Sequence, residues 1–496
     1  MVAHVSGRRL VTIALFVSTF LVSLDTSVIA TAMPTVIGQI GGIQLYAWVF
    51  SAYLLTSTVS VPIYGKLADL YGRKPVFLVA TTIFLVSSML CGQSQSMEQL
   101  IVFRLLQGVG AGGMLPITQT VLGDLYSLEE RARITGLFSS VWGISGLLGP
   151  AIGGFLTEHA SWRWAFYVNS PLCILSILLI GRFLHERIEH KRHRIDYLGA
   201  IILSAAVVAL LVGLQNQTLE LYLVAAVLVP VFVWQERRAT EPLVPLYLFG
   251  QRIIGVSTLG AVFTGWLLFS QTTFLPPFVQ GVLGATPTIA GFVMAGSSIG
   301  WPLASWVGGR LVLRWGFRAS CMLGAVVLAT GYALLWRMPP DAPLWYPTLT
   351  QFITGAGFGF ASLVFILAAQ NAVGWQQRGV VTGANQFARS IGGTIGVSIA
   401  GAIFSSGVAA AAAAGAGVSA NDLLSPTVRA ALPVAQLQLL EGALVGALHS
   451  VYLLLIGIAL ATLVVAALLP GGPPEQRYED ASKAELRSLV GSAAED

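Results

Sequence analysis

The chain has 496 residues, of which 55% are hydrophobic and only 10% are charged, and its mean hydropathy is +0.78. A soluble domain carries about 25% charged residues, so a soluble protein of this length could not cover its surface with so few charges. The net charge of +5 comes from basic residues scattered without interleaved aromatic residues, which argues against a nucleic-acid-binding stripe. The composition therefore indicates a polytopic membrane protein with no nucleic-acid partner.

A membrane-spanning helix needs about 20 largely apolar residues. The fourteen stretches that meet this need are 9–33, 46–68, 75–93, 98–122, 134–158, 164–184, 196–214, 218–236, 254–280, 286–312, 317–337, 344–370, 379–406 and 445–469. With a cytoplasmic N-terminus, all but five of the 27 Lys and Arg residues fall on the cytoplasmic side, as the positive-inside rule requires. The five exceptions are Arg104, Arg163, Arg337, Arg389 and Arg429. The sequence thus predicts an all-α, multi-pass protein of the cell membrane with both termini in the cytoplasm.

The first predicted span is too long for the core of a signal peptide, and it holds Asp25, the one acidic residue well inside any predicted span. An ionised carboxylate inside a bilayer costs about 2.5–3.5 kcal/mol on insertion scales, so an intramembrane acid is a functional candidate. Burial favours the neutral form of a carboxyl group, which can then exchange protons. Asp25 is the predicted proton-coupling residue. The alternative is a structural acid that is hydrogen-bonded to neighbouring helices.

A short charged turn, GKLADLYGRK at 65–74, follows the second predicted span. Its glycines allow a tight turn or close helix approach, and its basic residues mark a cytoplasmic face. The turn closely resembles the loop signature between the second and third helices of the major facilitator superfamily of transporters. The resemblance implies a conformational lock formed by Gly65, Asp69, Gly72, Arg73 and Lys74. In this lock, Asp69 is expected to face the positive N-terminus of the helix that begins near Arg378 and Gly379.

The fourth predicted span carries Arg104 and Gln107 in the run RLLQGVG, which resembles the superfamily's helix-4 motif. At 1.5 Å per residue, Asp25 lies about 24 Å up a helix that rises from the cytoplasm, and Arg104 lies about six residues down a descending helix. Both residues then fall in the outer half of the membrane, where pairing or coupling through water is feasible. We expect Arg104 to tune the proton exchange of Asp25, the alternative being an arginine that only anchors structure.

Three further stretches resemble drug:proton antiporters of the superfamily. The runs 24–34, around Asp25, and 162–171, before the sixth span, resemble the fourteen-span EmrB/QacA type. The run GISGLLGPAIGG at 143–154 resembles the helix-5 motif of antiporters, in which small residues form a smooth face and a proline removes a backbone donor. Its motif residues are Gly146, Gly149, Pro150, Gly153 and Gly154. Ordinary packing of small residues is the alternative explanation.

The glycine turn has a second copy 244 residues later, where Gly309 and Gly316 again stand seven residues apart and Leu313 replaces the acid. Eight predicted spans separate the copies instead of six, so an extra helix pair is expected between two related halves. The predicted domains are an N-terminal six-helix bundle (1–190), an inserted two-helix hairpin (191–240), a C-terminal six-helix bundle (241–470) and a cytoplasmic tail (471–496). The resemblance implies the major facilitator fold for the two bundles.

The sequence also predicts the structure of two segments outside the spans. The capping-box pattern at 127–130 predicts a short cytoplasmic helix before the fifth span. The Ala- and Gly-rich stretch 408–417 is expected to lie in a long external loop.

The second half has no counterpart of Asp25 in its first predicted spans, because no acidic residue occurs between Glu241 and Asp341. The two halves are therefore not symmetric in their proton-binding residues. The family resemblance implies that relatives with divalent cationic substrates use such an acid, so this specialisation is not expected. The candidate residues of a substrate cavity are Gln107, Trp266, Gln271, Asn385 and Arg389. Arg389 either contacts substrate or extends toward the cytoplasmic interface. For an aromatic residue such as Trp266, a position facing lipid or the core is the more ordinary explanation.

Together these features predict a proton-coupled antiporter that exports hydrophobic or amphipathic, preferably cationic, drugs by alternating access. The alternative is an exporter dedicated to one metabolite, siderophore, antibiotic or lipid, and uptake stays open. An enzyme or a sensor is not expected, because the histidines lie mostly in loops and no HExxH, GxSxG or P-loop pattern occurs. We expect no catalytic residue, no metal and no cofactor, with the proton gradient as the energy source. The expected partners are small molecules, protons and membrane lipids, and the expected state is a monomer.

Overall fold

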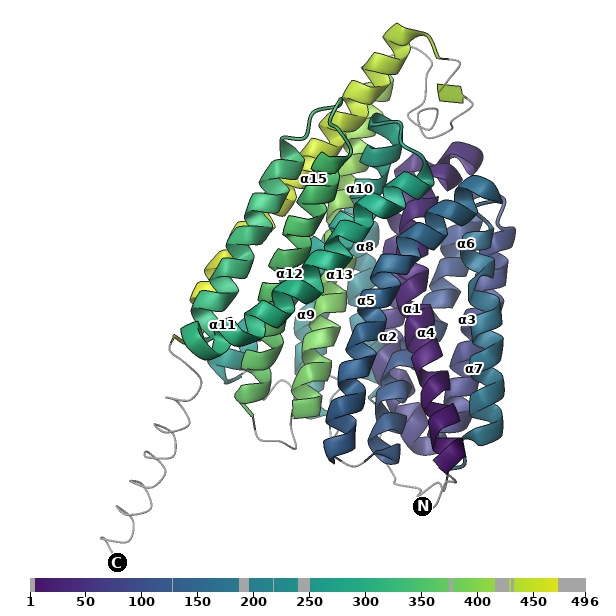
Figure 1. The fold of residues 1–496 in the computed structure, drawn as a ribbon, viewed down its shortest axis with the longest axis vertical. Helices are drawn as coiled ribbons and strands as arrows, with labels where there is room; N and C mark the ends of the chain where they lie inside the picture. The colour runs from purple at the N-terminus through teal and green to yellow at the C-terminus, as the bar shows by residue number, and fades with distance from the viewer. Residues whose placement is uncertain are drawn as a thin grey trace, which may run out of the picture.

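A computed structural model describes residues 5–126, 128–186, 196–216, 218–239, 250–373, 378–414, 428–429 and 432–471. The described residues form helices and short connections, with no strand among them (Figure 1). Within these ranges, eleven helical segments are long and apolar enough to cross a membrane. The prediction of an all-α, multi-pass membrane protein is confirmed. The predicted count of fourteen spans stays a prediction.

The first half of the chain forms a bundle of long helices joined by short turns. Its helices are α1 (Val5–Ile40), α2 (Tyr46–Tyr71), α3 (Arg73–Gln93), α4 (Met97–Leu125), α5 (Leu128–His159), the short α6 (Trp164–Tyr167) and α7 (Asn169–Phe183), with a 3-10 turn η1 (Ile43–Leu45) before α2. The N-terminus of α4 is capped by the Ser96 hydroxyl, which accepts a hydrogen bond from the backbone N–H of Gln99 at 3.3 Å. Helix α1 packs against α4, α5 and α7, which makes it the centre of this bundle.

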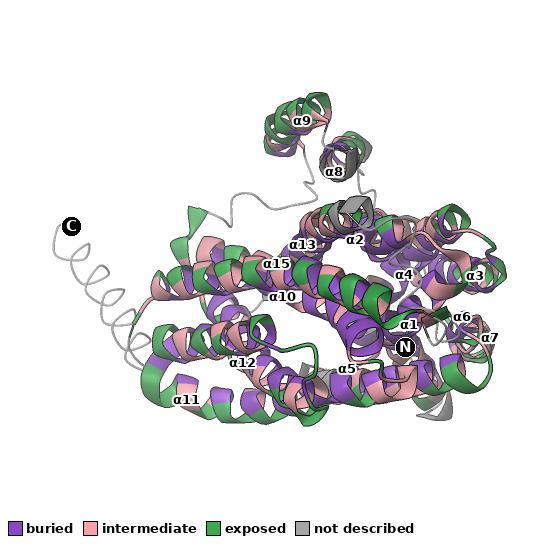
Figure 2. Cartoon of the chain, turned by 90° about the horizontal axis from the view of Figure 1, so that it is seen from above, coloured by how far each residue is buried: buried purple, intermediate pink, exposed green. Residues whose placement is uncertain are grey.

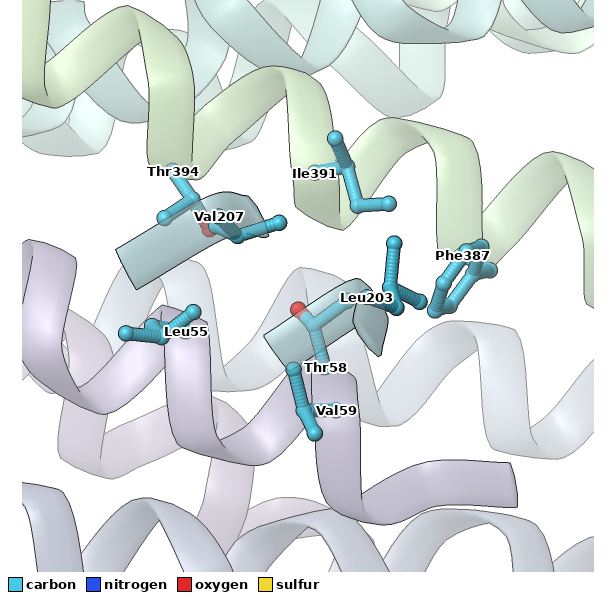
Figure 3. Close-up of a pocket in the computed structure, with 8 residues that line it drawn as sticks. All are labelled: Leu55, Thr58, Val59, Leu203, Val207, Phe387, Ile391 and Thr394. Atoms are coloured by element: carbon cyan, nitrogen blue, oxygen red, sulfur yellow. The ribbon is translucent and has the colours of Figure 1, made fainter. Parts of the chain in front are cut away.

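The two helices that follow, α8 (Tyr197–Asn216) and α9 (Leu219–Arg238), pack against each other. Seen from above, they stand outside the main body of the protein (Figure 2). Helix α8 also packs against α2 of the first half and α13 (Arg378–Ala414) of the second. Figure 3 shows this three-helix contact, where mostly apolar side chains meet: Leu55, Thr58, Val59, Leu203, Val207, Phe387, Ile391 and Thr394. The hairpin therefore covers the seam between α2 and α13.

The remaining helices are α10 (Arg252–Pro277) with a π-helical turn η3 (Phe278–Val282), α11 (Pro287–Trp336), α12 (Trp345–Asn371), α13 and α15 (Val434–Ala467). At 1.5 Å per residue, the 50 residues of α11 would extend about 75 Å, more than twice the thickness of a bilayer core. The helix is interrupted at Gly316, whose φ of 79° and ψ of 178° are not helical. Both of its arms pack on α12, because Gly300 lies against Phe352 and Gly324 lies against Ala361.

Gly316 and Gly72 are the second glycines of the two related turns, and they have similar backbone angles. Gly72, between α2 and α3, has a φ of 91° and a ψ of 155°. A positive φ with an extended ψ is open only to glycine, so both turns depend on this residue. The repeat that the sequence predicts thus has the same backbone form in both halves.

Three helices extend beyond the predicted segments. The run 128–159 is one continuous helix, α5, so the separate short helix expected from the 127–130 pattern does not form. Helix α13 continues to Ala414, so much of the Ala-rich stretch is helical, as its high helix propensity favours. Helix α15 begins at Val434, eleven residues before the predicted start of the last span. The domain boundaries predicted near 190 and 240, and nearly all of the tail 471–496, lie outside the described residues.

Candidate functional site

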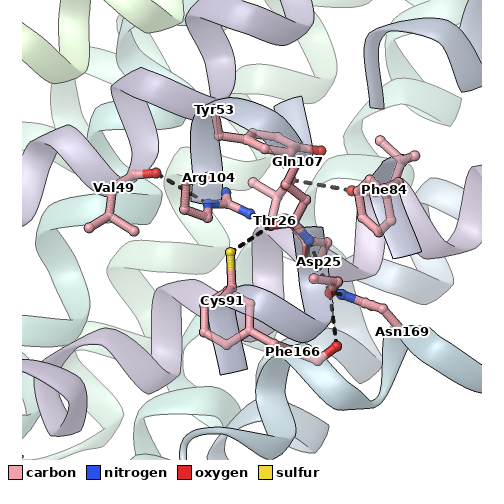
Figure 4. Close-up of polar contacts among 12 residues, drawn as sticks. Asp25, Thr26, Val49, Tyr53, Phe84, Cys91, Arg104, Gln107, Phe166 and Asn169 are labelled. Atoms are coloured by element: carbon pink, nitrogen blue, oxygen red, sulfur yellow. Dashed lines mark hydrogen bonds and ion pairs between the residues drawn. The ribbon is translucent and has the colours of Figure 1, made fainter. Parts of the chain in front are cut away.

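Asp25 of α1 and Arg104 of α4 form an ion pair in the interior of the first bundle (Figure 4). The Arg104 Nη1 atom donates to Asp25 Oδ2 at 2.7 Å. Both side chains are 0% exposed. The structure therefore brings the predicted proton-coupling residue and its predicted partner into direct contact.

The second oxygen of Asp25 accepts hydrogen bonds from two amides. Gln107 Nε2 of α4 donates to Asp25 Oδ1 at 2.9 Å, and Asn169 Nδ2 of α7 donates to the same oxygen at 2.8 Å. Both amides also reach the Ser88 hydroxyl of α3 at 3.1 Å, and this hydroxyl donates to the Phe166 carbonyl at 2.9 Å. Side chains of α4 and α7 therefore meet at the carboxylate of α1, and Ser88 of α3 bonds to both amides.

Sequence reasoning missed Asn169 and Ser88. Asn169 lies in the 162–171 run, which was interpreted through its aromatic residues, and the available signal was a polar amide at the start of an apolar span. Ser88 offers no comparable signal, because a serine in an apolar span usually bonds its own helix.

Arg104 is held from two further directions. Its Nε donates to the Val49 carbonyl of α2 at 3.2 Å, and its Nη1 also donates to Gln107 Oε1 at 2.8 Å. Its guanidinium carbon lies 4.0 Å from the centre of the Tyr53 ring, a cation–π contact worth about 2 kcal/mol when desolvated. Only its Nη2 lacks a partner within the described part of the chain.

The two charges of this cluster balance each other. With Asp25 ionised, the buried pair has no net charge and the carboxylate accepts three strong hydrogen bonds. A proton on Asp25 would leave the guanidinium as an uncompensated buried charge, which is costly in a low-dielectric interior. The ionised carboxylate of α1 is therefore bound to α4 and α7 through these three hydrogen bonds.

The second half has a neutral cluster at the corresponding place. Gln271 of α10 lies 246 residues after Asp25, and Gln351 and Thr354 of α12 lie 247 residues after Arg104 and Gln107. Gln271 Nε2 donates to Gln351 Oε1 at 2.7 Å and to Thr354 Oγ1 at 2.8 Å. Both glutamines are buried, at 3% and 2% exposed. The amides of Gln271 and Gln351 thus occupy the positions that correspond to Asp25 and Arg104 in the first half.

The charged turn is fixed by a residue that sequence reasoning missed, Glu186. Its carboxylate follows α7 and accepts from the backbone N–H groups of Arg73 at 3.0 Å and Lys74 at 3.1 Å. Arg73 Nη1 also donates to Glu186 Oε1 at 3.2 Å. A carboxylate at these free N–H groups stabilises the N-terminus of α3. An acid 113 residues away in the chain gave no local signal.

Other parts of the predicted lock are only partly described. A Cβ on Gly65 would meet no atom within 4 Å, so this glycine is not required by close packing. The side chain of Asp69 and the predicted contact with Arg378 and Gly379 lie outside the described side chains.

The glycines of the predicted antiporter motif place α5 close to two other helices. A Cβ on Gly149 would lie 2.6 Å from the Cβ of Ser27 in α1, and a Cβ on Gly153 would lie 2.6 Å from the Val28 carbonyl. On another face of α5, Gly146 lies against Ser298 of α11, and Gly154 lies against the start of α11 at Pro287. The carbonyl of Pro150 lies against Gly291 of α11. These small residues let α5 approach both halves closely.

The five predicted cavity residues lie in three different places. Gln107 belongs to the Asp25 cluster, and Gln271 belongs to its neutral counterpart. Trp266, Asn385 and Arg389 lie at the contact of α10 with α13: Trp266 packs on Gly396, Asn385 Nδ2 donates to the Ser257 carbonyl at 3.1 Å, and Arg389 packs on Gly265. The structure does not bring all five together.

Comparison with known proteins places these features in a family. The model of the Major Facilitator Superfamily matches residues 15–397. Multidrug resistance protein 3 of Bacillus subtilis is 33% identical over 490 residues, covering 94% of this chain and 95% of that protein. The multidrug transporter protein MdtP of the same organism is 36% identical over 408 residues, covering 80% of this chain and 75% of that protein. The efflux pump FUS6 of Gibberella moniliformis is 30% identical over 420 residues, covering 80% of this chain and 74% of that protein.

Solved structures share the fold at low sequence identity. A bacterial homologue of the human lysosomal transporter Spinster, inward-facing and unoccupied, has a TM-score of 0.68 at 15% identity, covering 93% of this chain and 98% of that one. The nucleoside transporter NupG has a TM-score of 0.60 at 12% identity, and the match covers 92% of this chain and 98% of that one. The family and these structural neighbours are transporters and not enzymes. With the family match over most of its spans, the chain belongs to the major facilitator superfamily.

Proposed function

We propose that this protein exports hydrophobic or amphipathic small molecules from the cytoplasm in exchange for protons. The observation that carries the proposal is the buried ion pair of Asp25 and Arg104, in which one carboxylate of α1 bonds to side chains of α4 and α7. The relatives named multidrug transporter and efflux pump support drug export, and the resemblance to the fourteen-span EmrB/QacA type supports proton antiport.

In the proposed cycle, Asp25 accepts a proton from the outside and loses it to the cytoplasm. Protonation removes the ionic part of its bond to Arg104 and weakens the bonds from Gln107 and Asn169. The two protonation states then prefer different arrangements of α1, α3, α4 and α7. Coupling follows if the substrate binds one of these arrangements more tightly than the other.

The test is transport by the purified protein in proteoliposomes with an imposed pH difference and a panel of hydrophobic dyes and drugs. We expect uphill movement of at least one compound, opposite to the proton flow, and its loss when a protonophore collapses the gradient. Protein-free vesicles control for passive partition of weak bases. Transport that is the same with and without the pH difference would contradict proton exchange.

We also propose fourteen spans, with both termini in the cytoplasm. If α11 counts as two spans and α5 and α8 are added to the eleven apolar segments, the total is fourteen. The start of α1 and the end of α15 lie at the same end of the bundle, which agrees with an even number (Figure 1). The proposed domains are bundles at 1–190 and 241–470 with the hairpin 191–240 between them. A reporter fused after Asp496 is expected to read as cytoplasmic, and an external reading would contradict this topology.

The charged turn is proposed to set the balance between conformations. Replacing Arg73 with Ala, or Glu186 with Gln, removes bonds that join α3 to the end of α7. A lost conformational contact of about 1–3 kcal/mol shifts populations by roughly 5- to 150-fold. We therefore expect turnover to fall while substrate affinity changes little, measured as kcat and KM in the same vesicles. The matched control is Glu220→Gln, which replaces an exposed acid in the first turn of α9.

Normal turnover of both variants, with an unchanged inward-to-outward ratio in spin-label distances, would leave the turn as a topology marker only.

A further inference from the structure

Arg389 is a cation deep within a membrane-spanning helix. It lies eleven residues after Arg378, where α13 begins, and so about 16 Å along the helix axis. This is about half the thickness of a bilayer core. Its backbone and the Cγ atom of its side chain pack on Gly265 of α10. A charge at this depth is costly unless it is paired or solvated.

The only hydrogen-bond partner that the described residues give the Arg389 side chain is a neutral amide. Arg389 Nη2 donates to Gln386 Oε1 at 2.5 Å, and Gln386 is itself exposed. No ion pair joins Arg389 to a carboxylate within the described part of the chain. A guanidinium has five N–H donors and no acceptor, so most of its capacity is unused here.

No acid among the described residues near α13 balances this charge. In the first bundle, Asp25 neutralises Arg104. At the corresponding place in the second bundle stands Gln271, which is neutral, and the sequence has no acid between Glu241 and Asp341. Glu441 of α15 is already paired with Arg429 at 2.7 Å. Among the described residues, the positive charge of the partly exposed Arg389 therefore has no acid that balances it.

The same seam between α10 and α13 also contains a buried donor whose hydrogen-bonding capacity is unused. The indole Nε1 of Trp266 is buried and has no hydrogen-bond partner among the described residues. Trp266 of α10 packs on Gly396, and Phe269 of α10 packs on Gly393. Both glycines belong to α13 and follow Arg389 in the chain. The contact between α10 and α13 therefore contains two aromatic rings and N–H groups that have no acceptor within the described part of the chain.

We propose that Arg389 binds an anionic oxygen group of the transported compound, so that the substrates are amphipathic organic anions. A planar guanidinium suits the paired oxygens of a carboxylate or sulfonate, and the rings of Trp266 and Phe269, which lie along the same helix contact, suit an aromatic body. This inference rests on the proposed export function, and it replaces the preference for cations expected from the sequence.

The experiment compares two probes with the same rings, 1-anilinonaphthalene-8-sulfonate and N-phenyl-1-naphthylamine, which lacks the sulfonate. Equilibrium binding is measured by fluorescence with the purified protein in nanodiscs of zwitterionic lipid, after subtraction of protein-free nanodiscs. The wild-type protein is expected to bind the sulfonate more tightly. Arg389→Gln is expected to weaken sulfonate binding by about tenfold to a hundredfold and to leave binding of the neutral probe unchanged.

Two variants and one further probe pair make the test specific. Arg389→Lys keeps the charge without the planar fork, so it is expected to recover part of the sulfonate affinity. Arg337→Gln, which removes an exposed arginine at the end of α11, is expected to behave like wild type. Tetraphenylborate and tetraphenylphosphonium share one shape and carry opposite charges, and the wild-type protein is expected to prefer the anion.

Equal binding of both naphthalene probes by the wild-type protein, unchanged sulfonate binding by Arg389→Gln, or preference for tetraphenylphosphonium would overturn the proposal. Competition by phosphatidylglycerol added to the nanodiscs would assign the site to a lipid headgroup and also overturn it. The assay measures binding at equilibrium and applies no pH difference, so it does not depend on proton coupling. A failure of proton coupling would therefore leave this result unaffected.

Discussion

Asp25→Asn is expected to abolish uphill export driven by an imposed pH difference. Asparagine keeps the size of the side chain and its acceptor for Arg104, but it cannot bind and release a proton. Asn169 now donates to the carboxylate, and its Oδ1 atom has no partner among the described residues, so this amide can turn its oxygen toward the new donor. The variant therefore resembles the protonated state and is expected to fold and to bind substrate. Accumulation of a transported dye in proteoliposomes measures the loss.

The matched control is Asp341→Asn, the same change at an exposed acid between α11 and α12. It is expected to transport like the wild-type protein. If Asp25→Asn still concentrates substrate under the imposed pH difference, the coupling site lies elsewhere. Glu158 is then the next candidate, because its Oε2 atom accepts from the Thr288 N–H at 3.3 Å and so joins α5 to α11.

Arg104→Gln is expected to lower the free energy of unfolding by about 3–5 kcal/mol at neutral pH. The change leaves Asp25 as a buried carboxylate without its cation, and it removes the contact with the Tyr53 ring. Acid pH should recover part of the loss, because a protonated carboxyl group is neutral. The double variant Asp25→Asn/Arg104→Gln should recover most of it, because no charge is then buried.

Unfolding can be followed with a thiol-reactive dye, since Cys91, Cys173 and Cys321 are all buried and free. Their exposure on heating reports the loss of both bundles. Equal unfolding temperatures for wild type and Arg104→Gln, or a double variant no more stable than the single one, would contradict a stabilising ion pair. The double variant should not transport uphill, which separates its stability from its function.

Much of the architecture is encoded locally. Long apolar stretches with few charges predict membrane helices, because a helix satisfies every backbone hydrogen bond within its own segment. The two glycine turns predict a repeat, and Gly72 and Gly316 have the backbone angles that only glycine adopts readily. Helix ends were predicted less well. The extension of α13 to Ala414 and of α15 back to Val434 shows that helix propensity continues beyond the most hydrophobic residues.

Asp25 and Arg104 could be found from the sequence because a charge within an apolar span is rare, and its cost marks it. The neutral groups that complete the site become apparent only in the packed protein. Asn169 and Ser88 reach the Asp25 cluster from helices distant in the chain, and Glu186 caps α3 from 113 residues away. Polar residues such as these are ordinary in isolation. Their roles depend on which helices pack together, and a buried charge selects its hydrogen-bond partners only once that packing exists.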